Sequence, residues 1–173
     1  DLKSHEELSG KKIQYFDPEL DKNYTPYVLE TSIGLDRMFL AIISNSFKVE
    51  TLEDRSTRNV MSIPKQIAPN KLAVLPLLKK DGLPEYARKV MNEFSHEINL
   101  VYDEKDAIGR RYRRQDAIGT PYCITVDHDS LKNETVTIRD RDSMKQDRVK
   151  IEEVKKFLNS KIDISIWLKK LSW

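Results

Sequence analysis

Arginine is the residue type in this sequence whose spacing most directly suggests chemistry. Four of the five residues from 110 to 114 are arginines, and they surround one tyrosine in the stretch GRRYRRQD. A guanidinium group donates parallel hydrogen bonds to phosphate oxygens, so such a cluster can bind a polyanion. A helical wheel places Arg110, Arg113 and Arg114 opposite the apolar residues of the same helix. A solvated helix face therefore also explains the cluster, without any ligand.

A second group of basic residues follows in TVTIRDRDSMKQDR. In a strand, Arg139 and Arg141 point to one side, while Val136 and Ile138 point to the other. Lys145 and Gln146 come directly after this strand. A sheet face that carries guanidinium groups can contact phosphates and unstacked single-stranded bases. Surface ion pairs with the neighbouring aspartates are an equal alternative.

A third group lies in ETSIGLDRMFL, residues 30–40. Glu30 and Ser32 are two residues apart on an expected strand, so they project to the same side, where a carboxylate and a hydroxyl can hold a small ammonium group. Arg37 falls in the first turn of the following helix, beside N–H groups that favour phosphate oxygens. A capping Ser32 and a surface Arg37 are the simpler interpretation.

Composition limits the class of protein. Apolar residues make up 39% of the 173 residues, charged residues 34%, and the formal net charge is only +2, so any polyanion binding must be local. The single cysteine, Cys123, excludes an intramolecular disulfide and predicts a buried structural thiol. The three histidines do not give a zinc-binding spacing, and no apolar stretch reaches the roughly 18 residues of a membrane span. These features predict a soluble intracellular protein without a metal site.

The pattern of apolar residues predicts an α/β fold with a mixed sheet flanked by helices. Strands are expected over residues 27–32, 72–78, 99–103, 121–127 and 134–142, with HDSLKN as the loop of a closing hairpin. Helices are expected over 34–47 with a buried apolar face, along the stripe from Leu83 to Ile98, between Asp106 and Gly119, and from Ile151 through Leu158. Residues 48–70 are expected to connect two units, and Ile164, Trp167 and Leu168 suggest that the C-terminal tail packs on the domain.

These residues resemble a known family. YTPYVLETSIGLDRMFLAII resembles motif 3 of a class II aminoacyl-tRNA synthetase, and KLAVLPLLKKDGLPEYA, IGRRYRRQDAIGTPYCITVD and TVTIRDRDSMKQDRV resemble the anticodon-binding domain of homodimeric glycyl-tRNA synthetases. The resemblance covers nearly the whole chain. It implies the end of a catalytic domain at 1–50, a connector at 51–70, and an anticodon-binding domain at 71–173 with a mixed sheet of about five strands (class IIa).

The resemblance also implies roles for single residues. Arg37 would contact the ATP triphosphate, and Glu30 and Ser32 would hold glycine. The residues expected on the anticodon side are Arg139, Arg141, Lys145 and Gln146, followed by Arg113 and Arg114. The longer enzyme would be a cytoplasmic homodimer that activates glycine with ATP and Mg²⁺ and then transfers it to tRNA(Gly).

Motifs 1 and 2 of that family are missing from these 173 residues. The chain is therefore expected to be a C-terminal portion that holds no cofactor and supports no ATP–pyrophosphate exchange by itself. A non-catalytic nucleic-acid-binding module on the same fold, such as a DNA polymerase accessory subunit, is the alternative. The presence of Glu30, Ser32 and Arg37 favours the enzyme, and a generic α/β interaction domain with solvated arginines is a third interpretation.

Overall fold

The computed structural model describes residues 1–169, and the chain divides into two units, Asp1–Met38 and Phe39–Trp173. The first unit contains helix α1 (Leu2–Ser9) and an antiparallel hairpin of β1 (Tyr15–Asp17) and β2 (Lys22–Tyr24). The rings of Tyr15 and Tyr24 meet edge to face across this hairpin, 5.9 Å apart. The division between the units falls inside α2 (Leu35–Ser46).

Two expectations for the region around α2 are wrong. Residues 27–32 form no strand, and the strands described in the first unit pair with each other and leave this segment unpaired. An extended segment without a neighbouring strand has no partner for its backbone groups, so its propensity alone does not make a strand. The predicted helix over 34–47 is present, but its apolar face is not buried, since Phe39 is 64% exposed.

The segment predicted as a connector carries a second antiparallel hairpin. Strand β3 (Phe47–Thr51) follows α2 directly and pairs with β4 (Thr57–Met61), with Glu50 opposite Arg58. Residues alternate along β4, so Arg58 and Val60 are buried while Thr57 and Asn59 are exposed. This hairpin packs on the α/β domain through β4. The boundaries 1–50, 51–70 and 71–173 stay a prediction.

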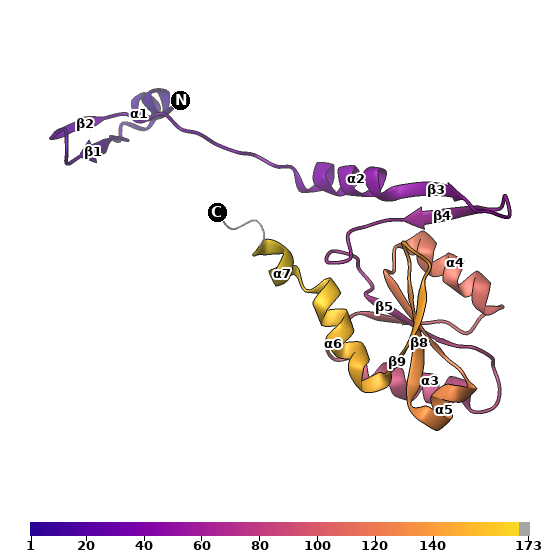
Figure 1. The fold of residues 1–173 in the computed structure, drawn as a ribbon. Coiled ribbons are helices and arrows are strands. Elements are labelled where there is room, and N and C mark those ends of the chain that lie inside the picture. Colours follow the sequence, from indigo (N-terminus) through magenta and orange to yellow (C-terminus); the bar gives the residue numbers. More distant parts are fainter. Residues whose placement is uncertain (170–173) are drawn as a thin grey trace. The chain divides into compact units, whose positions relative to one another are not determined.

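A mixed sheet of five strands forms the centre of the second unit, within the part of the chain that the structure describes (Figure 1). Its order is β6-β5-β7-β8-β9, where β6, β5 and β7 are parallel and β8 and β9 are antiparallel to their neighbours. The strands are β5 (Leu72–Pro76), β6 (Leu100–Tyr102), β7 (Tyr122–Val126), β8 (Thr135–Asp140) and β9 (Gln146–Lys150). The predicted α/β class with about five strands is confirmed.

The two faces of the sheet are covered by different helices. Helices α3 (Leu83–Phe94) and α6 (Ile151–Ile162) pack on one face, where Val90 and Leu158 join a large apolar core. Helix α4 (Ile108–Ile118) covers the other face with a smaller core around Ala73, Leu75 and Cys123. Figure 1 shows α4 on the opposite side of the sheet from α3. Because β5 and β7 lie between both layers, all their residues are buried, as the continuous apolar run of β5 predicts.

Smaller elements differ from the sequence prediction. The expected loop HDSLKN is helix α5 (His128–Asn133), which begins with a capping box between Asp127 and Ser130. Strand β9 was not expected. Helix α7 (Ile164–Leu168) has exposed Ile164 and Leu168, so these two do not pack as predicted, and the side chain of Trp167 lies outside the described residues. Within residues 1–169, no helix is both long and apolar enough to span a membrane.

Lys65 attaches the segment between β4 and β5 to the sheet. Its Nζ contacts the carboxylate of Asp140, donates to Tyr122 Oη at 3.0 Å and lies 4.6 Å from the centroid of that ring. Burial alone would lower the pKa of Lys65, but the Asp140 and Tyr122 contacts raise it overall. Burial alone would raise the pKa of Asp140, and the hydrogen bond from Lys65 lowers it overall.

The first prediction concerns this pair. Because the folded pKa of Asp140 is depressed, its contribution is present above the unfolded value of about 3.9 and is lost as pH falls through the folded pKa. Lys65→Met should therefore reduce the free energy of unfolding at pH 7, and the difference from the unchanged chain should shrink near pH 3. Urea unfolding at both pH values measures it, and an equal difference at both would contradict the prediction.

Gly119 ends α4 in a left-handed conformation with φ of 87°, as the sequence predicts. A Cβ at this position would lie 3.1 Å from the Met61 carbonyl oxygen and 3.3 Å from Ile63 Cδ1. The close approach of the hairpin and the positive φ both require glycine here.

Gly119→Ala should therefore lower the free energy of unfolding by about 1–3 kcal/mol in urea titrations. Gly109→Ala is the matched control on the same helix, because its Cβ would meet no atom within 4 Å and alanine favours a helix by about 1 kcal/mol. The prediction fails when the two variants have the same stability.

Candidate nucleic-acid interface

A buried carboxylate binds two arginines underneath α4. Asp116 is fully buried, and Arg139 Nη1 and Nη2 donate to its two oxygens at 2.8 and 3.0 Å. Arg58 Nη1 donates to Asp116 Oδ2 at 3.1 Å and to the Arg141 carbonyl at 2.9 Å, while its Nε donates to Glu50 at 3.0 Å. This Asp116 cluster (Glu50, Arg58, Asp116 and Arg139) joins the β3–β4 hairpin, α4 and β8.

The two strand arginines that were expected to face RNA are mostly covered. Arg139 is 4% exposed and Arg141 is 2% exposed, because α4 lies across that face of the sheet. Arg141 donates to the carbonyls of Gly119 and Ile63 at 2.9 and 3.0 Å and pairs with Asp142. The two arginines do lie on the face opposite Val136 and Ile138, as predicted. Strand alternation does not reveal that helix α4 covers that face.

Arg139 nevertheless reaches one open hollow. Its guanidinium lies 4.7 Å from the centroid of the Tyr112 ring, and Tyr112 Oη hydrogen-bonds Thr125 Oγ1 at 2.6 Å. Burial alone would lower the pKa of Arg139, but the Asp116 hydrogen bonds raise it overall, so the group stays charged. The hollow has a volume of about 550 Å³ and is called the tyrosine hollow; its lining residues are Ala107, Gly109, Arg110, Tyr112, Arg113, Arg139, Met144 and Gln146.

The four arginines of α4 occupy different environments. Arg111 is 2% exposed and donates to the backbone carbonyls of Pro76, Lys105 and Asp106. Arg114 pairs with Asp103 and Asp106. Arg110 is exposed and lines the tyrosine hollow, and Arg113 lines that hollow and a neighbouring one. A single solvated face therefore does not describe the cluster. The predicted N-cap Asp106 is also displaced by one residue, to Ala107.

Of the six residues expected on the anticodon side, the structure brings three together. Arg113, Arg139 and Gln146 line the tyrosine hollow. Lys145 is exposed in the turn before β9 and is not among the lining residues. Arg141 is buried under Gly119, and Arg114 lines the neighbouring hollow beside β4.

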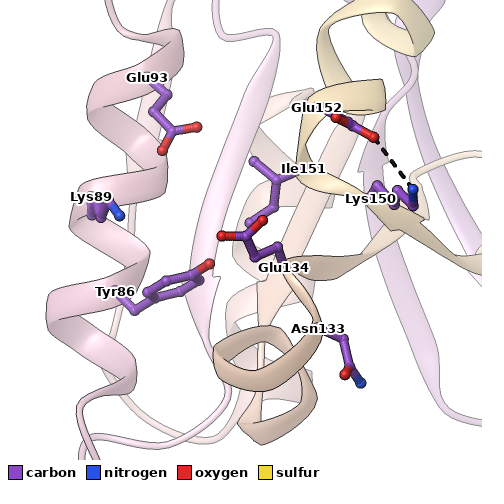
Figure 2. A pocket seen from close by; sticks show the side chains of 8 residues that line it. All are labelled: Tyr86, Lys89, Glu93, Asn133, Glu134, Lys150, Ile151 and Glu152. Carbon is purple, nitrogen blue, oxygen red and sulfur yellow. Dashed lines mark hydrogen bonds and ion pairs between the residues drawn. The ribbon is translucent and has the colours of Figure 1, made fainter.

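Another cavity lies on the opposite side of the domain, between α3 and the start of α6 (Figure 2). It has a volume of about 420 Å³, and its lining residues are Tyr86, Lys89, Glu93, Asn133, Glu134, Lys150, Ile151 and Glu152. Lys150 pairs with Glu152 at 3.5 Å, which leaves more carboxylate than free ammonium charge facing the cavity. Burial and the carboxylates of Glu134 and Glu93 raise the pKa of Tyr86. Such a lining repels phosphates.

The remaining site residues belong to the first unit and to α2. Glu30 and Ser32 are exposed in a segment without regular structure, so the strand that was to align them is not present. Arg37 is exposed in α2, with its side chain packed near Gly34. No cluster of three or more His, Cys, Asp or Glu residues suited to a metal occurs within residues 1–169. Cys123 is buried as predicted, and burial raises the pKa of its thiol to about 12.

Sequence reasoning missed Arg58, Arg111 and Asp116. A signal for Asp116 was available, because it follows Ile108 and Tyr112 at intervals of four and so lies on their buried helix face. A carboxylate on such a face requires cationic partners, and the structure supplies Arg139 of β8 and Arg58 of β4. Arg58 carried no comparable signal, since nothing in residues 48–70 indicates which strand position turns inward.

Comparison with known proteins decides the family. Residues 71–161 match the family described as "Anticodon binding domain". The chain belongs to the anticodon-binding domain family. The matched residues include the whole sheet and α4, so the Asp116–Arg139 pair lies inside the anticodon-binding domain and Arg58 lies outside it.

Relatives that match nearly the whole chain are named Glycine–tRNA ligase. The chain is 54% identical to the Clostridium acetobutylicum protein over 162 residues and 47% identical to the Borrelia hermsii protein over 164 residues. Each match covers 94% of this chain but only 35% and 37% of the relative, so the chain spans about a third of their length.

A solved structure gives the fold of this anticodon-binding domain independently. The RNA-binding domain of threonyl-tRNA synthetase from Cryptosporidium parvum superposes with a TM-score of 0.53 at 19% identity. The match covers 58% of this chain and 25% of that one. At this identity the likeness concerns the fold alone, and it agrees with the mixed five-stranded sheet.

The Asp116 cluster gives a stability prediction. Asp116→Asn removes the charge that compensates Arg58 and Arg139, so it should lower the free energy of unfolding by about 3–5 kcal/mol. Asp142→Asn is the control, because that carboxylate is 41% exposed and its pair with Arg141 should contribute less than about 1 kcal/mol. Denaturant titration of both variants measures the difference, and equal losses would contradict the role given to Asp116.

Proposed function

We propose that this chain reads the anticodon of tRNA(Gly) as part of a glycine–tRNA ligase. The observation that carries the proposal is the 54% identity to a protein of that name over 94% of this chain. The longer protein would activate glycine with ATP and Mg²⁺ and transfer it to tRNA(Gly). Within it, this portion binds the tRNA and does not perform the chemistry alone.

The tyrosine hollow is the proposed reading site. Anticodon bases are single-stranded and unstacked, and proteins bind such bases by stacking them on aromatic rings or guanidinium planes and by hydrogen-bonding their edges. Tyr112 and Arg139 offer ring and guanidinium surfaces here, while the Gln146 amide can donate and accept. Because the pair with Asp116 holds Arg139 in a fixed orientation, its donors would meet a base edge without reordering.

The other expected anticodon residues receive different roles. Lys145 is exposed beside Gln146, so we assign it a charge contact with the RNA backbone. Arg141 supports the turn after β8 through its bonds to Gly119 and Ile63. Arg114 is held by two aspartates and adds positive potential along α4.

Glu30, Ser32 and Arg37 are proposed to act in the longer protein. The carboxylate of Glu30 and the hydroxyl of Ser32 fit the ammonium group of glycine, and Arg37 fits the triphosphate of ATP, whose Mg²⁺ would neutralise further charge. Their exposure in this chain leaves them available for such ligands. We further propose a homodimer that works in the cytoplasm. The alternative of a non-catalytic polymerase accessory module has no support among the relatives described above.

The test is discrimination between anticodons. The 173-residue chain should bind a tRNA(Gly) anticodon stem–loop more tightly than the same stem–loop with its anticodon bases exchanged, by about 1–3 kcal/mol for each exchanged base that it contacts, as for base readout in general. Fluorescence anisotropy at fixed salt measures both affinities. Arg88→Gln, on α3 at the opposite face of the sheet and paired with Glu104, is the control and should leave the ratio unchanged. Equal affinity for both RNAs would contradict the proposal.

A further inference from the structure

Arg110 and Arg113 are the arginines of α4 that make no side-chain hydrogen bond or ion pair within residues 1–169. The Ser56 hydrogen bonds lower the pKa of Asp54, and the charge of nearby Arg113 lowers it further. In contrast with the exposed Arg110, Arg113 is half-buried. Its Nη1 is buried and makes no hydrogen bond, and within residues 1–169 its guanidinium forms no ion pair. Arg111, two residues earlier in α4, donates to three backbone carbonyls, and Arg114 contacts two carboxylates. A buried donor without an acceptor is uncommon in folded proteins and calls for an acceptor from outside the fold, such as water or a ligand oxygen.

The side chain of Arg113 separates two hollows. One is the tyrosine hollow, and the other, the hairpin hollow, has a volume of about 330 Å³. The hairpin hollow lies between β4 and α4, and its lining residues are Thr57, Arg58, Asn59, Arg113, Arg114 and Ala117. Its lining contains three arginines and no carboxylate, with the neutral hydrogen-bonding groups of Thr57 and Asn59 on the opposite wall.

The charges around the hairpin favour this hollow for an anion. The Asp116 and Glu50 carboxylates already compensate Arg58, and Asp103 and Asp106 hold Arg114. Among these three, Arg113 is therefore the one whose guanidinium forms no ion pair within residues 1–169. A further hollow beside the hairpin is lined by Glu50, Glu53 and Asp54, so a phosphate is repelled there and directed to the α4 side of β4.

We propose that the hairpin hollow binds a phosphodiester of the RNA whose adjacent bases occupy the tyrosine hollow, with Arg113 donating to the phosphate oxygens. The inference rests on the proposed function, but it adds a site that the anticodon-binding domain alone does not contain. The α4 wall lies inside the matched residues 71–161, while Thr57, Arg58 and Asn59 lie outside them. The hairpin thus extends the RNA-binding surface beyond the domain.

The principal experiment is the salt dependence of binding by the full 173-residue chain. Arg113→Gln should weaken binding of the tRNA(Gly) anticodon stem–loop about tenfold at low salt, because a hydrogen-bonded charge contact is lost. The slope of log K against log salt should become less negative by about 0.7, the value for one single-strand phosphate. Arg113→Lys should retain most of the slope, because it keeps the charge.

Two further variants serve as control and independent probe. Arg88→Gln removes the same charge from α3, on the opposite face of the sheet, and should change neither affinity nor slope. Asn59→Asp introduces a carboxylate on the β4 wall without altering α4, so it should weaken binding when Arg113 is intact. Thermal melting of each variant shows that the domain remains folded.

Stem–loops with single neutral methylphosphonate linkages then identify the phosphate. One linkage should reduce affinity for the unchanged chain and have no effect on Arg113→Gln. An unchanged slope for Arg113→Gln, or no linkage with this behaviour, would overturn the phosphate site even when the chain discriminates between anticodons. A loss of anticodon discrimination in Arg113→Gln would show that Arg113 reads a base and would also overturn it. Failure of the proposed function appears separately, as equal affinity of the unchanged chain for both anticodons.

Discussion

The buried Asp116 carboxylate, held between two guanidinium groups, determines how the parts of the α/β unit are assembled. Moving three charges out of water is unfavourable, and only close, well-oriented contacts compensate for it. Each contact comes from a different element: Asp116 from α4, Arg139 from β8 and Arg58 from β4. The position of α4 across the sheet, and of the hairpin across α4, is therefore fixed by one shared charge, more specifically than apolar contact alone would fix it.

The same contacts create the surface assigned to RNA. Asp116 balances the charge of Arg139 and holds it against the Tyr112 ring, where it lines the tyrosine hollow. Without this partner the side chain would be free to move. The chain has a net charge of only +2, so attraction of a polyanion depends on a few uncompensated donors. Arg110 and Arg113 supply them at the hollow, whereas Arg111 and Arg114 have their hydrogen-bonding groups engaged within the fold.

The sequence predicted the sheet better than the surface. The continuous apolar run of β5 identifies a strand buried on both faces, β7 shows the same burial with one hydrogen-bonded polar side chain, Thr125, and Gly119 marks the end of α4 because its φ is positive. Alternation correctly separated Arg139 from Val136 and Ile138, but it could not show that α4 covers the arginine side. That fact depends on long-range packing. Strand β9 was missed because four of its five residues are polar or charged and give no apolar period. In β3, Phe47 and Val49 do alternate with Lys48 and Glu50, but the run is short and was assigned to the end of a helix and to a connector.

Because of Arg58, the domain matched by the family and the unit that folds have different boundaries. The family match begins at residue 71 and contains the sheet with its helices. The charge balance of that module, however, is completed by a residue 13 positions earlier in the chain. Excision at the family boundary would leave Asp116 with Arg139 alone and open the α4 surface to solvent. The unit that folds is therefore longer than the matched domain, and the β3–β4 hairpin completes its charge balance.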